Sequence, residues 1–121
     1  MTLRFLLICS ILALSACGGR DRPEPAPEAV ALYPNETLAL RELINQYADE
    51  NQVPRPLVHK VIQRESDYRP EARNGPYYGM MQILPATARG MGFSGPPKAL
   101  LDAETNLKYA VKYLRGAWLV S

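Results

Sequence analysis

The chain has 121 residues, with 14 Lys and Arg against 12 Asp and Glu, and a formal net charge of +2. This length allows one small domain, and the lack of a basic block or stripe argues against nucleic acid as a partner. Eleven prolines exclude one long coiled coil, and two cysteines exclude a disulfide-rich miniprotein.

The first 16 residues have the composition of a secretory signal. Arg4 precedes an apolar run over residues 5–14, and small residues follow it up to Cys17. The run is too short to span a bilayer, so we predict a signal peptide over residues 1–16. The alternative is a buried N-terminal helix with an incidental cysteine, which the prolines that follow disfavour.

The small residues before Cys17 resemble a bacterial lipobox, a signal in which the cysteine is lipidated and becomes the first residue of the mature protein. The resemblance implies a membrane anchor through lipid on Cys17. Gly18 stands after the cysteine where a retention signal would have Asp. The resemblance therefore also implies that the protein faces the periplasm from the outer membrane.

The next segment is rich in proline, which stands at positions 23, 25, 27 and 34. Such a stretch favours extended, polyproline-like backbone and buries little surface. We interpret residues 17–34 as the lipidated cysteine and a tether. Residues 35–121 remain as the folded part.

Apolar residues recur at helical spacing from about residue 36 to residue 50, which predicts a first amphipathic helix. Pro56 suits the first turn of a second helix, which ends before Pro70. The apolar stripe of this second helix consists of Leu57, Val58, Val61 and Ile62. His59 lies off the stripe, so we expect a solvated side chain that binds no metal.

Glu65 continues that stripe, because it lies four residues after Val61 and three after Ile62. A carboxyl group at the end of a buried stripe suits a general acid, since burial disfavours its charged form. The structural alternative is a solvated glutamate, or one that Arg64 or Arg69 neutralises.

A loop is expected over residues 71–78, where Asn74-Gly75-Pro76 is a strong turn signal. Residues 79–88 form an apolar run in which Pro85 suits an early helical turn. Gln82 is a polar residue inside this run. Considered alone, the run is consistent with a core helix that turns Gln82 toward water.

A last helix is well marked. Asp102 is a good N-cap, and one face of the helix carries Leu107, Ala110, Val111, Leu114 and Trp118. This placement predicts that Trp118 belongs to the core.

Five short motifs follow one another along the chain: Glu65-Ser66, Gly79-Met80-Met81-Gln82-Ile83, Pro85-Ala86-Thr87-Ala88, Asn106-Leu107 and Tyr113-Leu114. Their ordered combination, over about residues 40 to 115, resembles the soluble lytic transglycosylase family. Met80 replaces the leucine that is usual after the motif glycine. The resemblance implies an all-α, lysozyme-like fold in which Asn106 and Tyr113 are structural residues of a helix beneath the cleft.

The same resemblance implies roles for individual residues. Glu65 matches the single catalytic acid/base. Ser66 and Gln82 match positions that support or line the sugar cleft, and Met81 matches an apolar wall. Tyr77 or Tyr78 could stack on a sugar ring.

The implied function is that of a cell-wall lyase. A lytic transglycosylase cleaves the β-1,4 bond between N-acetylmuramic acid and N-acetylglucosamine in peptidoglycan (murein) without water, leaving 1,6-anhydromuramoyl ends. It needs one carboxyl group and neither metal nor cofactor, whereas an ordinary glycosidase needs two. We see no convincing carboxylate partner for Glu65.

Two alternatives stay open. Members of the family continue into a further helical segment with an active-site tyrosine, whereas this chain stops in an apolar stretch at Ser121. We therefore expect residues 35–121 to be a partial domain that lacks its C-terminal part. One alternative is thus a non-catalytic peptidoglycan-binding or structural lipoprotein. The other is a lysozyme-type muramidase.

Overall fold

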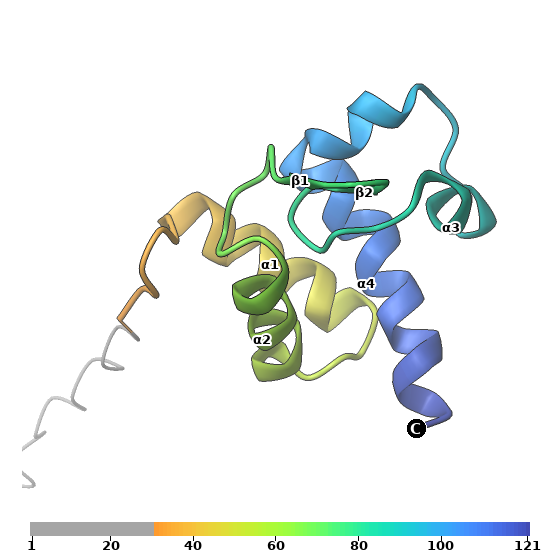
Figure 1. The fold of residues 1–121 in the computed structure, drawn as a ribbon. Helices are drawn as coiled ribbons and strands as arrows, with labels where there is room; N and C mark the ends of the chain where they lie inside the picture. The colour runs from red at the N-terminus through yellow and green to blue at the C-terminus, as the bar shows by residue number, and fades with distance from the viewer. Residues whose placement is uncertain (1–30) are drawn as a thin grey trace, which may run out of the picture.

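A computed structural model describes residues 31–121 (Figure 1). The predicted signal peptide, Cys17 and the first part of the predicted tether lie outside the described residues. The all-α prediction is confirmed, because helices dominate and the only strands within residues 31–121 form one small hairpin. The elements are α1 (Leu38–Glu50), α2 (Arg55–Glu65), β1 (Arg73–Asn74), β2 (Tyr77–Tyr78), α3 (Pro85–Gly90), the 3-10 helix η1 (Pro97–Leu101) and α4 (Ala103–Leu119).

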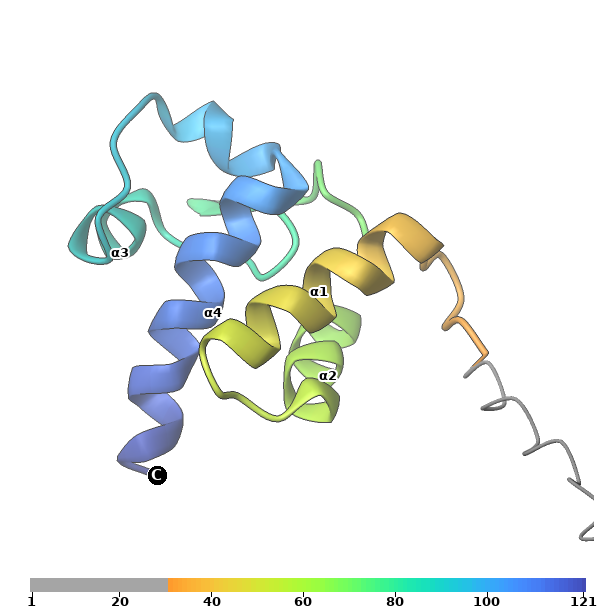
Figure 2. The ribbon, with the colours of Figure 1, turned by 180° about the vertical axis from the view of Figure 1, so that it is seen from behind.

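The first predicted helix is α1, and its start is set by a local cap. The Thr37 side chain accepts a hydrogen bond from the Leu40 N–H at 3.2 Å. The helix buries Ile44, Tyr47 and Ala48 and packs against both α2 and α4 (Figure 2). No helix of residues 31–121 is both long enough and apolar enough to cross a membrane.

The second predicted helix is α2, which carries Pro56 in its first turn as expected. It buries Val58 and Ile62 toward the core. The expectation of a solvated His59 is wrong, because this side chain is only 6% exposed. Periodicity placed it off the apolar stripe, but the chain after α2 folds back and covers it with Tyr68.

The predicted turn is the tip of the β1–β2 hairpin, in which Arg73 pairs with Tyr78 and Asn74 with Tyr77. Gly75 has a φ of 57° there, a conformation that glycine adopts without strain. The apolar run that follows is not one helix: residues 79–84 form a loop, and α3 begins at Pro85.

The last predicted helix is α4, where Asp102 caps the N-terminus by accepting from the Thr105 N–H at 3.0 Å. The first part of α4 buries Asn106, Leu107, Ala110 and Val111. The prediction that Trp118 belongs to the core is wrong, since Trp118 is 39% exposed. The stripe is continuous in sequence, yet the buried part of α4 ends at Val111. The core gathers fully buried side chains from several elements: Ile44, Val58, Ile62, Met80, Leu100, Leu107 and Val111.

Candidate active site

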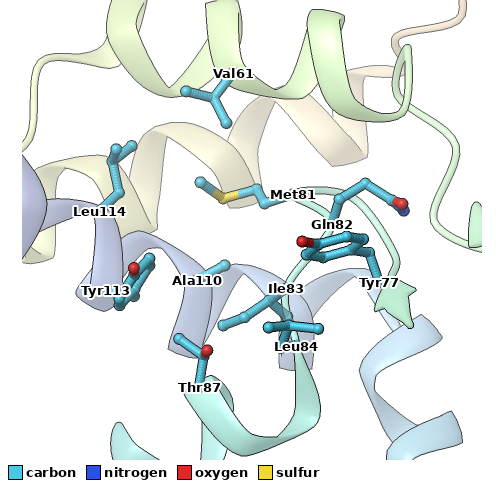
Figure 3. A pocket seen from close by; sticks show the side chains of 10 residues that line it. All are labelled: Val61, Tyr77, Met81, Gln82, Ile83, Leu84, Thr87, Ala110, Tyr113 and Leu114. Atoms are coloured by element: carbon cyan, nitrogen blue, oxygen red, sulfur yellow. The ribbon is translucent and has the colours of Figure 1, made fainter. Parts of the chain in front are cut away.

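A groove lies where the end of α2, the hairpin, the loop before α3 and the outer part of α4 meet. It consists of two adjoining cavities of about 300 Å³ each, which share Val61, Tyr77, Met81 and Gln82 in their walls. We call the one that also contains Glu65 the Glu65 cavity, and the other the apolar cavity. In Figure 3, Val61 from α2, Thr87 from α3 and Tyr113 from α4 surround Met81.

Glu65 is the last residue of α2, and its side chain is 34% exposed. It borders the Glu65 cavity together with Val61, one helical turn earlier on the same face. Oε1 of Glu65 lies 3.6 Å from Nε of Arg64, whose side chain is 85% exposed. Since the Arg64 guanidinium is in solvent, this pair holds the carboxylate weakly and leaves it accessible from the groove.

Ser66 follows Glu65 and does not border the groove. Its side chain is buried, and its hydroxyl donates to the carbonyl of Met80 at 2.7 Å, with the carbonyl of Ile62 3.3 Å away as a second, weaker acceptor for the same proton. The structure therefore places Ser66 as a support that joins the end of α2 to the loop before α3.

Asn106 supports the same loop from α4. Its Oδ1 accepts from the Met81 N–H at 3.0 Å, and its Nδ2 donates to the carbonyls of Tyr78 at 2.8 Å and Leu100 at 2.9 Å. Gly79 sits against this amide with a φ of 75°, and a Cβ there would collide with it and with the Leu100 carbonyl. The buried Asn106 is structural, as the resemblance implied.

Gln82 lies in both walls of the groove, in a left-handed conformation with a φ of 51°. Its Nε2 donates to the carbonyls of Ala72 at 3.0 Å and Gly79 at 2.9 Å. Its Oε1 is buried and has no hydrogen-bond partner within residues 31–121. Gln82 does not face bulk water, and its Oε1 is an acceptor buried beside the groove that the described residues leave unpaired.

The two tyrosines of the hairpin have different surroundings. Tyr77 is 42% exposed and borders both cavities. Tyr78 borders neither cavity, and the Arg73 guanidinium covers its ring at 3.6 Å from the centroid. Of the two candidates for sugar stacking, the structure therefore brings only Tyr77 to the groove. Met81, the predicted apolar wall, is buried and borders both cavities.

Sequence reasoning missed several residues of the groove. Asn74 borders the Glu65 cavity, although the sequence marked it only as part of a turn. Tyr113 was expected to be structural, but it is 51% exposed and borders the apolar cavity. The remaining wall residues of that cavity are Ile83, Leu84, Thr87, Ala110 and Leu114. Ile83, Thr87 and Leu114 stand in the family motifs, and the others lie only in an apolar run or stripe, neither of which distinguishes a groove wall from a core.

Metal-ligating side chains do not gather in the part of the chain that the structure describes. Within residues 31–121, no group of three or more His, Cys, Asp and Glu side chains is placed to hold an ion.

Comparison with known proteins adds a second line of information. A family model described as "Transglycosylase SLT domain" matches residues 42–118. The soluble lytic murein transglycosylases of Escherichia coli K12 and of Escherichia coli O157:H7 are each 30% identical over an alignment of 86 positions, which covers 64% of this chain. The match spans only 13% of the length of either relative. No solved structure matches the chain.

Proposed function

Because the chain belongs to the family of transglycosylase SLT domains, we propose that it is a lytic transglycosylase that cleaves the glycan strands of peptidoglycan. The observation that carries the proposal is the position of Glu65. Its carboxylate stands at the end of a groove among Asn74, Tyr77 and Gln82, which are aromatic and amide groups suited to a sugar.

In the proposed reaction, protonated Glu65 donates its proton to the oxygen that links C1 of N-acetylmuramic acid to N-acetylglucosamine. The C1–O bond breaks, and N-acetylglucosamine leaves with a free hydroxyl group. The C6 hydroxyl of the muramic residue then bonds to C1 and closes the 1,6-anhydro ring. The Glu65 carboxylate accepts the proton of that hydroxyl, which restores the acid without consuming water.

The walls of the groove suit this reaction. Tyr77 offers an exposed ring for a sugar face, and Met81 offers an apolar surface beside it. Glycan binding that opens the loop at Gln82 would give its buried Oε1, which has no partner among the described residues, an N–H or O–H donor. Among the described residues of the Glu65 cavity, Glu65 supplies the carboxylate, and a reaction with one acid/base group fits that composition.

We also propose that lipid on Cys17 holds the domain at the outer membrane, facing the murein. The support is the sequence before and after Cys17, which has the order of a signal peptide, a lipidation site and a proline-rich tether.

The first test is mass spectrometry of the products released from purified murein by the full-length protein and by Glu65→Gln. We expect anhydromuropeptides from the wild type. The variant should lose at least about a hundredfold in rate, because it has no proton to donate. Glu71→Gln is the matched control, since this exposed carboxylate lies in the neighbouring loop outside the groove and should keep full activity.

Other outcomes would identify another function. Products with reducing ends would show a muramidase. Binding of murein by the folded protein without any release would show a binding module and overturn the enzymatic proposal.

A further inference from the structure

A buried polar cluster lies on the face of α2 opposite the groove, and nothing in the proposed reaction uses it. His59 is two positions before Val61, which on a helix turns it nearly to the opposite side. Its ring is held at both nitrogens: Nε2 lies 3.0 Å from Oδ1 of Asn45 on α1, and Nδ1 lies 2.9 Å from the hydroxyl of Tyr68. We call His59, Asn45, Tyr68 and Glu36 the His59 cluster.

The hydrogen bonds of the cluster fit one neutral form of the ring. Oδ1 of Asn45 can only accept, so Nε2 of His59 donates to it. Gln63 donates to the Tyr68 oxygen at 3.3 Å, which leaves the Tyr68 O–H free to donate to Nδ1 of His59. The neutral imidazole with its proton on Nε2 therefore satisfies every partner.

Tyr68 is also part of an unusual turn. Asp67 and Tyr68 have φ values of 51° and 61°, so two consecutive non-glycine residues are left-handed immediately after α2. A bulky residue adopts this conformation only when its surroundings compensate for the strain. Tyr68 is 2% exposed, and its ring stacks on Tyr33 at 5.9 Å and contacts His59 at 6.0 Å between centroids.

The strained turn lies directly after two residues of the site. Glu65 ends α2, and Ser66 fastens the loop that carries Met81 and Gln82 through the Met80 carbonyl. A change in the backbone at Asp67 and Tyr68 therefore acts on both the acid and the floor of the groove.

We propose that His59 is a positioning residue: as the neutral imidazole it anchors Tyr68 and so holds the left-handed turn that aligns Glu65 and Ser66, and its protonation releases this turn. The inference rests on the proposed function, because alignment of Glu65 matters only if Glu65 transfers protons.

Protonation changes the partners of the ring. Nδ1 becomes a donor and can no longer accept from Tyr68, whose buried hydroxyl loses its acceptor. Oε1 of Glu36, 3.6 Å from Nδ1, then attracts the imidazolium. The charged groups around His59 are Glu36 from the segment before α1, Arg41 from α1 and Arg55 from the start of α2, besides the phenol of Tyr68.

Burial and the two arginines lower the pKa of His59 below its ordinary value of 6.5, although Glu36 opposes them. The neutral ring therefore prevails above that value, and the turn is released as the pH falls through the lowered pKa.

The activity test uses initial rates on soluble glycan strands across the acid range. The wild type should lose kcat on the acid side as Glu65 loses its alignment, with a smaller rise in KM, because Met81 and Gln82 move with the turn whereas Tyr77 lies in the hairpin outside it. In His59→Gln the amide can still accept from Tyr68 and donate to Asn45, so we expect retained activity without the step in the pH profile that belongs to His59. His59→Ala and Tyr68→Phe should each lose about tenfold in kcat, as misplaced catalytic groups do.

The matched control is Tyr47→Phe. Tyr47 is also a buried tyrosine with one side-chain partner, Glu104, at 2.9 Å, but it joins α1 to α4 away from the turn. It should lower stability without changing the pH profile. A step at the same pH in His59→Gln as in the wild type would overturn the proposal.

A second measurement separates this proposal from the proposed function. Amide shifts of the wild type, followed by NMR without substrate, should move at residues 66–69 and 80–82 with the same midpoint as the His59 ring, and should stop moving in His59→Gln. If the His59 ring titrates while these amides stay still, the positioning role is wrong even when murein is cleaved. If the amides follow the ring but no muropeptide is ever released, the proposed function fails and the coupling stands.

Discussion

At the scale of single residues, the shape of the groove depends on buried polar side chains that form hydrogen bonds with the protein's own backbone. Asn106 makes three hydrogen bonds to the backbone of the segments beneath the groove, and the Ser66 hydroxyl donates to the Met80 carbonyl. Gly79 lets these segments approach each other, since its missing side chain leaves the space that the Asn106 amide occupies. The exposed Tyr77 and the half-buried Glu65 are thus positioned by neighbours that lie outside the groove.

Gly79→Ala should lower the free energy of unfolding by about 3 kcal/mol, because the new methyl group collides with the Leu100 carbonyl and the backbone is left-handed. Gly116→Ala is the matched control. Gly116 lies within α4, and a Cβ there meets no atom within 4 Å, so the change should stabilise by about 0.5–1 kcal/mol. Urea denaturation measures both, and equal effects at the two glycines would contradict the packing argument.

At the scale of elements, the segment before α1 joins α1 to α2. Glu36 is buried and accepts from the Tyr33 N–H at 2.8 Å and from Nη2 of Arg41 at 2.6 Å. Burial by itself raises the pKa of Glu36, but these hydrogen bonds outweigh it and hold the pKa below its ordinary value of 4.5. Glu36 and His59 thus place two titratable groups at the contact between α1 and α2. The folded protein is most stable when both are unprotonated.

Stability should therefore fall with acid in two steps. Both pKa values are lower in the folded protein than in the unfolded chain, so the unfolded chain binds more protons as the pH drops. We expect a constant melting temperature at neutral pH, a first decrease below pH 6.5 from His59 and a further decrease below pH 4.5 from Glu36. Calorimetry across this range measures both steps.

Glu36→Gln tests the second step. The variant should lose the decrease below pH 4.5 and should be less stable at neutral pH by about 3 kcal/mol, because Arg41 loses its buried partner. Asp49→Asn is the control, since Asp49 and Arg55 form an exposed pair that contributes little. An unchanged acid profile in Glu36→Gln would refute the assignment.

At the scale of the whole molecule, the first described residues of the chain pack against the domain beside α2. Tyr33 lies within the predicted tether, and its ring stacks on Tyr68 at 5.9 Å. The chain that leads from Cys17 therefore reaches the domain beside the His59 cluster, on the face of α2 away from the groove. With the proposed anchor on Cys17, this arrangement would leave the groove free for a glycan strand.

Cys17→Ala tests the anchor. The wild type, expressed in bacteria with a labelled fatty acid, should incorporate the label and fractionate with the outer membrane, because acyl chains supply the membrane affinity. The variant should be unlabelled and leave the membrane fraction. Cys9→Ala should behave as the wild type, since Cys9 lies within the predicted signal peptide. Incorporation of the labelled fatty acid into the Cys17→Ala variant would refute lipidation at Cys17.

Much of the fold could be predicted from the sequence because its signals are local. Apolar spacing placed α1, α2 and α4, Pro56 and Asp102 marked two helix starts, and the turn at Gly75 was correctly located. The sequence did not distinguish the loop over residues 79–84 from a helix, because the loop is as apolar as a core helix. Its backbone is set by hydrogen bonds from Ser66 and Asn106, which are distant in sequence.

The sequence by itself determined α1, α2 and α4, the order of the motifs and the family, because each depends on residue types at short spacing. Only the tertiary structure decided that His59 is buried, that Trp118 is exposed and that Tyr77 rather than Tyr78 borders the groove. The physical reason is the same in each case. The burial and the hydrogen-bond partners of a side chain depend on which distant segment packs against it, and helical periodicity carries no information about that segment.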